Sequence, residues 1–358
     1  MKTSYYINGI GIISPQRTFD SQEFLPEIAA YDQNVLTCIA PDFKEYIPPV
    51  QLRRLNRMLR IGLSASTICL RDAKRNAMDG IVTATGYGFL SDTAVFMNEI
   101  LSQQEQHVAP THFMQSTYNA LGGLVALSIQ CKGYNNTYVS KGFAFENALD
   151  DALLQLNENP RQHFLLGAFD EASPSQLNTH TRLGYFKQQH VPSTNLFADK
   201  SSGTLQGEGA AFFSLSGEPT DTTWCALHDV QTLYKPDSEE SLFAAADILL
   251  AKHGLTYAAV DILVSGENGD AVNDRYLKAL AENKLAHATR ARFKHLCGEY
   301  CTASAFALWI AAAILKHQTV PAALTTPGPA SASRPVSTIL VANQYLGNNY
   351  SLMLLTKK

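Results

Sequence analysis

Cys297 and Cys301 are the only two of the six cysteines that lie close together in this sequence. A thiol at a helix start can act as a nucleophile, and clustered thiols can bind a metal ion. No second cysteine pair and no histidine cluster accompanies this pair at zinc-finger spacing, so we expect no metal site. The sequence also contains no Gly-x-Ser-x-Gly segment, which disfavours a serine hydrolase.

Several carboxylates in the second half of the chain could also do chemistry. Glu267 and Asp270 follow a short apolar run, and Glu299 lies two positions before Cys301. One hypothesis is therefore an enzyme that uses Cys301 or these carboxylates in a cleft. The simpler interpretation of Cys301 is a small apolar residue on a buried helix face, because free cysteines are usually buried and inert.

The composition sets limits on the class of protein. The 358 residues are 46% hydrophobic and 17% charged, as in a globular protein with a large core. A net charge of -4 gives no basic field for nucleic acid. The apolar stretch 303–315 is too short to cross a bilayer, and the run at 5–13 is interrupted by Asn8 and glycines, unlike a signal peptide. The scattered cysteines then indicate reduced thiols, and we expect a cytoplasmic protein.

Short apolar runs alternate with amphipathic stretches along the chain, which predicts an α/β layer structure. The predicted strands are Tyr5–Ile13, Gly80–Thr85, Thr137–Ser140, Phe164–Gly167, Ala210–Leu215, Ile262–Val264, Ser337–Ala342 and Tyr350–Leu355. The predicted helices are Leu52–Asn76, Thr93–Ser102, Asn119–Gln130, Phe145–Asn157, Ser238–His253, Ala271–Asn283 and Thr302–Lys316. A polar, proline-containing stretch at 217–223 divides the chain, so we expect an N-terminal half 1–216 and a C-terminal half 217–358. A second loop is expected at Thr325–Pro335.

Five segments, taken in order, resemble the β-ketoacyl synthase family. Residues 6–15, Tyr-Ile-Asn-Gly-Ile-Gly-Ile-Ile-Ser-Pro, resemble its first strand and turn, and residues 132–142 resemble the strand that delivers the nucleophile to a helix. Gly-Glu-Gly-Ala at 207–210 is similar to the family's glycine-rich segment. Residues 294–298, Lys-His-Leu-Cys-Gly, resemble its Lys-x-x-x-Gly-His segment, and 343–347, Asn-Gln-Tyr-Leu-Gly, resemble a shortened gating loop.

This resemblance implies a thiolase-like fold with two similar α/β halves in five layers (α-β-α-β-α). It also implies a dimer in which strands near the nucleophile pair across a twofold axis, carrier-protein thioesters as substrates, and no cofactor. Within the family, the chain is most similar to the chain-length-factor type found beside aryl polyene and flexirubin ketosynthases. That similarity rests on the segment 46–54 and on the short total length.

The resemblance also locates the positions at which the family carries its catalytic cysteine and two histidines. These positions are Gly142, Gly266 and Glu299. Condensation needs a thiolate to carry the acyl chain and two imidazoles to stabilise the negative charge that develops on the thioester oxygen. Neither glycine supplies such a group, and a carboxylate at position 299 would repel the developing enolate. We therefore expect no condensation by this chain alone.

Lys294 and Cys301, on either side of Glu299 in the sequence, could form a residual site. Lys294 keeps the family's spacing but has lost its acidic partner, because the matching helix position is Leu308, so Glu299 is the alternative partner. His295 lies four positions from the family's histidine and is not expected to replace it. Glu208, in the glycine-rich segment, is expected to accept backbone hydrogen bonds.

Two further sets of residues have competing interpretations. The resemblance places Phe113 and Met114 near the dimer axis, where they would line the partner's acyl tunnel; plain core packing is the alternative. Four arginines recur at helical spacing, and they could dock an acidic acyl carrier protein or form a solvated face with internal pairs. They are Arg53, Arg54, Arg57 and Arg60.

The expected function is thus a non-catalytic, chain-length-factor-like subunit that pairs with an active ketosynthase and shapes its acyl tunnel. Acyl carrier protein would be the second partner. Two alternatives stay open: a thiolase-fold acyltransferase or hydrolase that uses Cys301, and a homodimer that only binds acyl chains.

Overall fold

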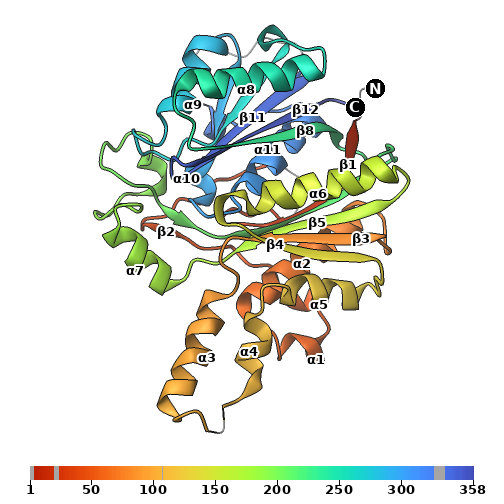
Figure 1. Cartoon of the computed structure of the whole chain (residues 1–358), viewed down its shortest axis with the longest axis vertical. Helices are drawn as coiled ribbons and strands as arrows, with labels where there is room; N and C mark the ends of the chain where they lie inside the picture. The colour runs from red at the N-terminus through yellow and green to blue at the C-terminus, as the bar shows by residue number, and fades with distance from the viewer. Residues whose placement is uncertain (1–3, 20–23, 107, 326–334) are drawn as a thin grey trace.

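Ten strands form one continuous mixed sheet in the computed structural model, which describes residues 4–19, 24–106, 108–325 and 335–358 (Figure 1). The strand order is β10-β9-β11-β12-β8-β1-β7-β5-β3-β4. The N-terminal unit contains β1 (Tyr5–Ile13), β3 (Gly80–Thr85), β4 (Tyr134–Val139), β5 (His163–Asp170) and β7 (Gly209–Ser216). The C-terminal unit contains β8 (Cys225–Tyr234), β9 (Ile262–Ser265), β10 (Thr289–Arg292), β11 (Thr338–Tyr345) and β12 (Asn349–Thr356). Most of the loop expected at 325–335 lies outside the described residues.

The two units have the same topology. In each unit, the first two strand pairs in the order are antiparallel and the next two are parallel. The two orders are β1-β7-β5-β3-β4 and β8-β12-β11-β9-β10. They join where β1 and β8 pair through Tyr5, Tyr6 and Ile7. The sequence therefore encodes two copies of one strand pattern, while the division at 216/217 into folding units stays a prediction.

Helices cover both faces of each unit, and one helical layer is shared (Figure 1). The shared layer holds α6 (Ala144–Glu158) and α11 (Ser304–His317), whose buried side chains belong to one core with residues of both units. Helices α2 (Arg57–Asp72) and α5 (Ala120–Ser128) cover the outer face of the N-terminal unit. Helices α8 (Glu239–Lys252) and α9 (Arg275–Ala279) cover the other. This is the predicted α-β-α-β-α order.

The helix predicted over Leu52–Asn76 is two helices. Helix α1 (Pro49–Leu52) is short, and α2 begins at Arg57 because the Asn56 side chain accepts a hydrogen bond from the Leu59 amide at 2.7 Å. The helix predicted over Ala271–Asn283 also starts late, because the Asp270 carboxylate binds the amides of Val272 and Asn273 and holds a turn there.

The sequence analysis does not predict several helices and strands that the structure contains. Strand β10 is an edge strand with two arginines, and the outer part of β8 is half-exposed, so neither shows a clear apolar pattern. The others are short: β2 (Val35–Leu36), β6 (Gln206–Gly207), α4 (Pro110–Ser116), α7 (Pro174–Arg182) and α10 (Lys294–Cys297).

Helices α3 (Leu90–Ser102) and α4 form a hairpin that projects from the N-terminal unit (Figure 1). Beside it, β4 is the last strand of the sheet and leads directly into the segment 140–143. In the described part of the chain, no helix has the length and hydropathy needed to cross a bilayer.

Candidate functional site

Two of the predicted catalytic positions meet the C-terminal end of β11. Gly142 lies in a 3-10 helix just before α6, and a Cβ added to it would lie 2.6 Å from Cδ1 of Tyr345. Gly266 follows β9, and a Cβ added there would lie 2.2 Å from Oδ1 of Asn343. Positions far apart in the sequence therefore converge on one strand end, and each is packed too tightly for a side chain.

The third position, Glu299, is tied to the same strand end. Its side chain forms a fully buried ion pair with Lys294, as the sequence predicted, and accepts a hydrogen bond from Asn268 Nδ2 at 2.9 Å. Lys294 Nζ also reaches the Gln344 carbonyl at 3.4 Å. Burial raises the pKa of the Glu299 carboxyl, while the Lys294 ammonium lowers it. Glu299 thus neutralises a buried cation.

Almost no open space remains between these groups. A small cavity of about 10 Å³ is lined by residues that include Tyr87, Tyr300, Cys301, Tyr345 and Glu299. Such a volume accommodates about one water molecule. An acyl thioester does not fit into this volume.

Cys301 lines this cavity but is poorly suited to be a nucleophile. It is 3% exposed, and burial raises the pKa of its thiol well above the ordinary value, with the nearby Asp170 adding to the effect. The thiol packs so closely against Gly86 that a Cβ there would lie 2.2 Å from Sγ. A protonated, enclosed thiol is a weak nucleophile.

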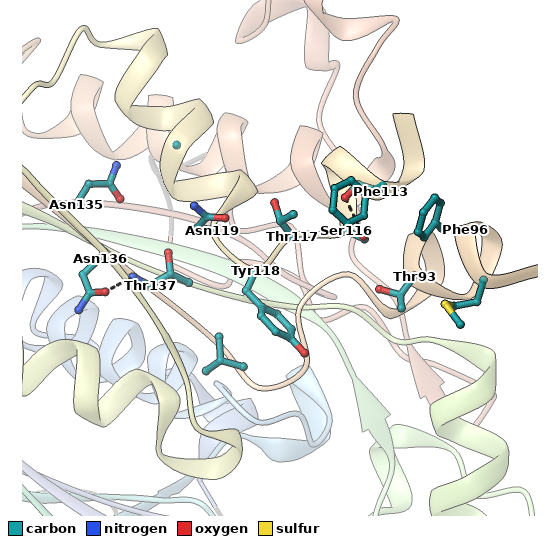
Figure 2. Close-up of a pocket in the computed structure, with 13 residues that line it drawn as sticks. Thr93, Phe96, Phe113, Ser116, Thr117, Tyr118, Asn119, Asn135, Asn136 and Thr137 are labelled. Carbon is teal, nitrogen blue, oxygen red and sulfur yellow. Dashed lines mark hydrogen bonds between the residues drawn. The ribbon is translucent and has the colours of Figure 1, made fainter. Parts of the chain in front are cut away.

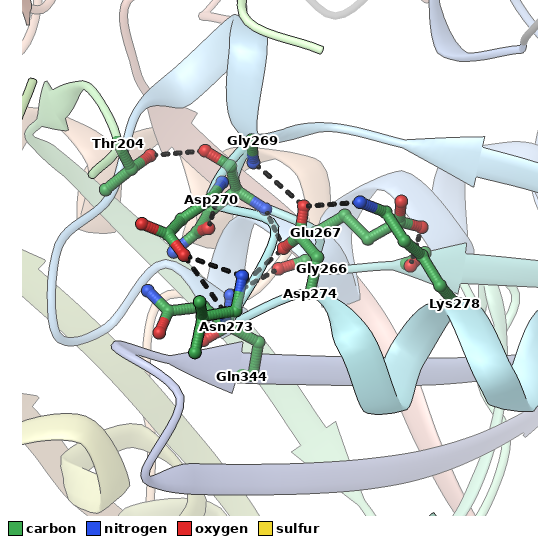
Figure 3. Close-up of polar contacts among 12 residues, drawn as sticks. Thr204, Gly266, Glu267, Gly269, Asp270, Asn273, Asp274, Lys278 and Gln344 are labelled. Atoms are coloured by element: carbon green, nitrogen blue, oxygen red, sulfur yellow. Dashed lines mark hydrogen bonds and ion pairs between the residues drawn. The ribbon is translucent and has the colours of Figure 1, made fainter. Parts of the chain in front are cut away.

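The carboxylates that follow β9 form hydrogen bonds and an ion pair with other parts of the chain (Figure 3). Glu267 pairs with Arg290 at 2.6 Å and accepts a hydrogen bond from the Ser265 hydroxyl at 2.7 Å. Asp270 accepts a hydrogen bond from the Gly203 amide at 2.5 Å. Together with Glu299, these are the carboxylates of the alternative enzyme hypothesis, and each has a structural partner.

Asp274 is a member of this network that the sequence analysis missed. Its carboxylate accepts hydrogen bonds from the amides of Asn268 at 2.7 Å and Gly269 at 3.0 Å (Figure 3). Burial, followed by the negative charge of Glu267, raises the pKa of Asp274 to about 7. No sequence signal separates Asp274 from an ordinary helix-start aspartate, because its pKa depends on a carboxylate seven residues away.

His295 does not face the cavity. Its Nε2 donates to the Ala323 carbonyl at 3.0 Å, and its ring contacts Phe197 at a centroid distance of 5.2 Å. Burial lowers the pKa of this imidazole to about 4, so it is neutral at physiological pH. Within the described ranges, no group of three or more His, Cys, Asp or Glu residues is arranged to hold a metal ion.

Glu208 has the structural role expected for it. It accepts hydrogen bonds from the amides of Cys38 at 2.7 Å and Ala172 at 3.1 Å, and it pairs with Arg57.

The four arginines do not share one helix face. Arg53 and Arg54 lie in the turn between α1 and α2, and Arg60 donates from Nε to the Leu55 carbonyl. Arg57 is held by Glu208. The four arginines therefore form no continuous docking stripe, because Asn56 interrupts the helix, and the internal pair of Arg57 agrees with the alternative interpretation.

An open groove of about 890 Å³ runs between the α3–α4 hairpin and β4 (Figure 2). Phe113 lines it and contacts Phe96 with ring centroids 5.4 Å apart. Met114 is next to Phe113 in α4 and is 60% exposed. Both predicted tunnel residues therefore lie at the surface, and the alternative of plain core packing is wrong.

Sequence comparison identifies the family. Residues 33–216, just over half of the chain, match the family described as "Beta-ketoacyl synthase, N-terminal domain". The chain belongs to the β-ketoacyl synthase family. No curated protein sequence matches the chain significantly.

Solved structures with the same fold include ketosynthase pairs. The chain is similar to the ishigamide ketosynthase/chain length factor, with a TM-score of 0.79, 15% identity and 100% of both chains covered. It is similar to the ketosynthase ApeO in complex with its chain length factor ApeC from Xenorhabdus doucetiae, with a TM-score of 0.76, 15% identity, and 99% and 98% of the two chains covered. A complex of a type II polyketide acyl-carrier protein with its ketosynthase bound to the hexaketide gives 0.77 at 13% identity, with 100% of both chains covered.

Proposed function

We propose that this chain is a chain-length-factor-like subunit, inactive by itself, that pairs with an active ketosynthase. The observation that carries the proposal is the position of Tyr345, whose ring fills the space that a nucleophile at position 142 would need. A family scaffold that keeps its fold but closes its reaction site suits an accessory subunit. The partner would supply the cysteine and both histidines.

The chemistry of the other two positions supports the same conclusion. Gly266 has no imidazole, and its backbone packs against Asn343. The Glu299 carboxylate accepts hydrogen bonds from Lys294 and Asn268. An acceptor held in this way does not donate a hydrogen bond to a thioester oxygen. Cys301, the alternative nucleophile, is enclosed and protonated at neutral pH because burial raises its pKa.

The surface around β4 supports a protein partner. One side of β4 is the free edge of the sheet, which is a template for pairing with another chain. Large exposed apolar side chains gather on α3, α4 and α5, on the turn between α4 and α5, and on β4, and such a surface favours association. They are Val95, Met97, Leu101, Phe113, Met114, Tyr118, Leu127, Tyr134 and Val139.

The position of the groove between the hairpin and β4 suggests how this chain would affect the partner's acyl tunnel. In a pair built through β4, Phe113 and Met114 would reach toward the partner's acyl tunnel and limit its depth. Carrier-protein thioesters would be the substrates of the pair, with no cofactor. The complexes of ketosynthases with a chain length factor or with an acyl-carrier protein among the similar folds support this arrangement. An aryl polyene or flexirubin-type product is proposed on the resemblance of residues 46–54.

Co-expression with the ketosynthase encoded beside this chain tests the proposal. We expect a one-to-one heterodimer by size-exclusion chromatography and, after loading with acyl carrier protein, an acyl mass on the partner only. Phe113→Asp should weaken the pair, whereas Leu154→Asp on α6 should not, although the two residues are similarly exposed at 53% and 58%.

Two other outcomes would contradict the proposal. A stable homodimer that becomes acylated would mean that this chain carries its own nucleophile, and Cys301→Ala would then test which residue it is. A homodimer that binds acyl chains without being acylated would instead favour an acyl-binding protein.

A further inference from the structure

Helix α4 carries both predicted tunnel residues, Phe113 and Met114, but hydrophobic burial does not hold this helix in place. None of its seven residues, all of which the structure describes, is buried, and no side chain caps its first turn. A helix of two turns is marginal by itself, because few hydrogen bonds offset the entropy lost when it forms. Contacts with other elements must therefore decide where the two side chains lie.

The contacts between α4 and α3 do not supply this anchor. The Phe113 ring lies 5.4 Å from the Phe96 ring, and Nδ1 of His112 is 3.0 Å from Oδ1 of Asp92 (Figure 2). Helix α3 is itself a surface helix, and Asp92 is its one buried residue among those that the structure describes. These contacts fix α4 relative to α3, but they do not fix it relative to the body of the protein.

Gln115 connects α4 directly to the body of the protein. Its Oε1 accepts a hydrogen bond from the Asn56 amide at 2.8 Å, and its Nε2 donates to the Arg54 carbonyl at 2.5 Å. Both partners are backbone groups of the turn between α1 and α2. Helix α2 begins directly after this turn and is a core helix, with buried residues that include Met58 and Leu59. Gln115 thus attaches a surface helix to the start of a core helix.

The chemistry of this contact requires an amide side chain. A backbone N–H needs an acceptor and a backbone carbonyl needs a donor, and a glutamine side chain offers one of each. Because two atoms of Gln115 bind two groups of one turn, the contact restricts the direction of α4 as well as its distance. A glutamate at position 115 would keep the acceptor and lose the donor, and a leucine would lose both.

The first turn of α3 is attached to the body at the same base of the hairpin. Nδ2 of Asn56 donates to Oδ2 of Asp92 at 2.6 Å, and the Ser91 amide donates to Oε1 of Glu171 at 2.6 Å. Helix α3 is therefore held at its first turn, and α4 is held at its last turn by Gln115. Loss of the Gln115 contact would release α4 while the start of α3 stays attached.

We propose that Gln115 is a positioning residue, which holds Phe113 and Met114 in place and thereby sets the length of the acyl chain that the pair makes. The inference rests on the proposed function, in which these two side chains limit the partner's tunnel. Phe113 and Ser116 line the groove, whereas Gln115 does not, so Gln115 acts through the position of α4 (Figure 2). Its attachment to the turn before α2 is a property of this chain alone.

Hydrogen exchange of the isolated full chain tests the attachment. In Gln115→Leu, which keeps a side chain of similar size, we expect the amides of α4 to be about tenfold less protected, the effect of losing two hydrogen bonds. Gln115→Glu should give an intermediate loss, because it keeps one of the two bonds. Thr111→Ser is the matched control, since Thr111 is an exposed residue of the same helix, and it should leave the protection unchanged. Equal protection of α4 in Gln115→Leu and the wild-type chain would overturn the inference.

The chain length made by the co-expressed pair tests the consequence, with the acyl chains measured by intact mass on the carrier protein. Gln115→Leu should form the pair in the same yield but lower the ratio of the wild-type length to other lengths about tenfold, for the same reason. Gln115→Glu should lower it less, and Phe113→Ala should also change the length.

The pattern of failures separates this inference from the proposed function. Unchanged lengths in Gln115→Leu beside changed lengths in Phe113→Ala would overturn the inference and leave the proposed function standing. Unchanged lengths in both variants would overturn the tunnel role of α4 and the inference with it. A wild-type chain that forms no pair in size-exclusion chromatography would overturn the proposed function itself, and with it the role of Gln115 in setting chain length.

Discussion

Tyr345 determines whether position 142 can hold a side chain. Because a Cβ at Gly142 would overlap the Tyr345 ring, Gly142→Cys is expected to destabilise the fold by about 1–3 kcal/mol, the range typical of overpacking. In the Tyr345→Ala background, the same substitution should cost less, because the ring is gone. Thermal unfolding of the four members of this double-mutant cycle measures the coupling. Additive effects would show that Tyr345 does not fill the site.

A second prediction at the residue scale concerns the contribution of the buried Lys294–Glu299 ion pair to stability. Glu299→Gln leaves the Lys294 ammonium buried without a counter-charge, so the free energy of unfolding should fall by about 3 kcal/mol. Lys294→Met combined with Glu299→Gln should restore part of this loss in urea denaturation. Lys252→Met, at an exposed pair with Asp229, should change little. Unchanged stability of Glu299→Gln would contradict the pairing.

The raised pKa of Asp274 predicts how the stability of the chain depends on pH. Its pKa is raised from 3.8 to about 7, so the native state binds this proton more tightly than the unfolded chain does. Stability contributed by the protonated form is therefore lost as pH rises from about 4 to about 7, by roughly 2 kcal/mol between pH 5 and 7.5. Asp274→Asn cannot ionise, so urea denaturation at these two pH values should show a smaller difference for this variant. An equal difference in both proteins would assign the effect to other groups.

At the scale of elements, the start of α2 depends on the capping side chain of Asn56. Asn56→Ala removes the hydrogen bond to the Leu59 amide and the contact with Asp92, and it should destabilise the chain by about 1–2 kcal/mol. Ser238→Ala is a suitable control, because the Ser238 side chain makes no capping hydrogen bond at the start of α8. Chemical denaturation compares the two variants. Equal losses would mean that the Asn56 cap contributes nothing specific.

At the scale of the whole molecule, the two repeated units share a core. Phe145 and Phe213 of the N-terminal half belong to the same buried cluster as Leu308 and Met353 of the C-terminal half. The sheet is also continuous through β1 and β8. We therefore expect one calorimetric unfolding transition, and we expect residues 1–216 expressed alone to be insoluble. Two separate transitions would show that the halves fold independently.

The sequence was sufficient for features that depend on neighbours along the chain. Short apolar runs predicted the strands Tyr5–Ile13 and Gly80–Thr85 with their observed bounds. It failed for β10, whose edge position leaves arginines in a strand. It also failed between α1 and α2, because Asn56 ends one helical pattern and starts another within an apparently continuous helix.

By itself, the sequence determined the α/β class, the family resemblance and the absence of the cysteine and histidine side chains at the positions predicted for them, since these are properties of residue order. Only the tertiary structure decided that Tyr345 and Asn343 occupy the space beside Gly142 and Gly266. It also decided that burial and the negative charge of Glu267 raise the pKa of Asp274. The physical reason is that packing, desolvation and charge pairing depend on distances in space, and residues far apart in the chain set those distances only once the sheet and its helices have assembled.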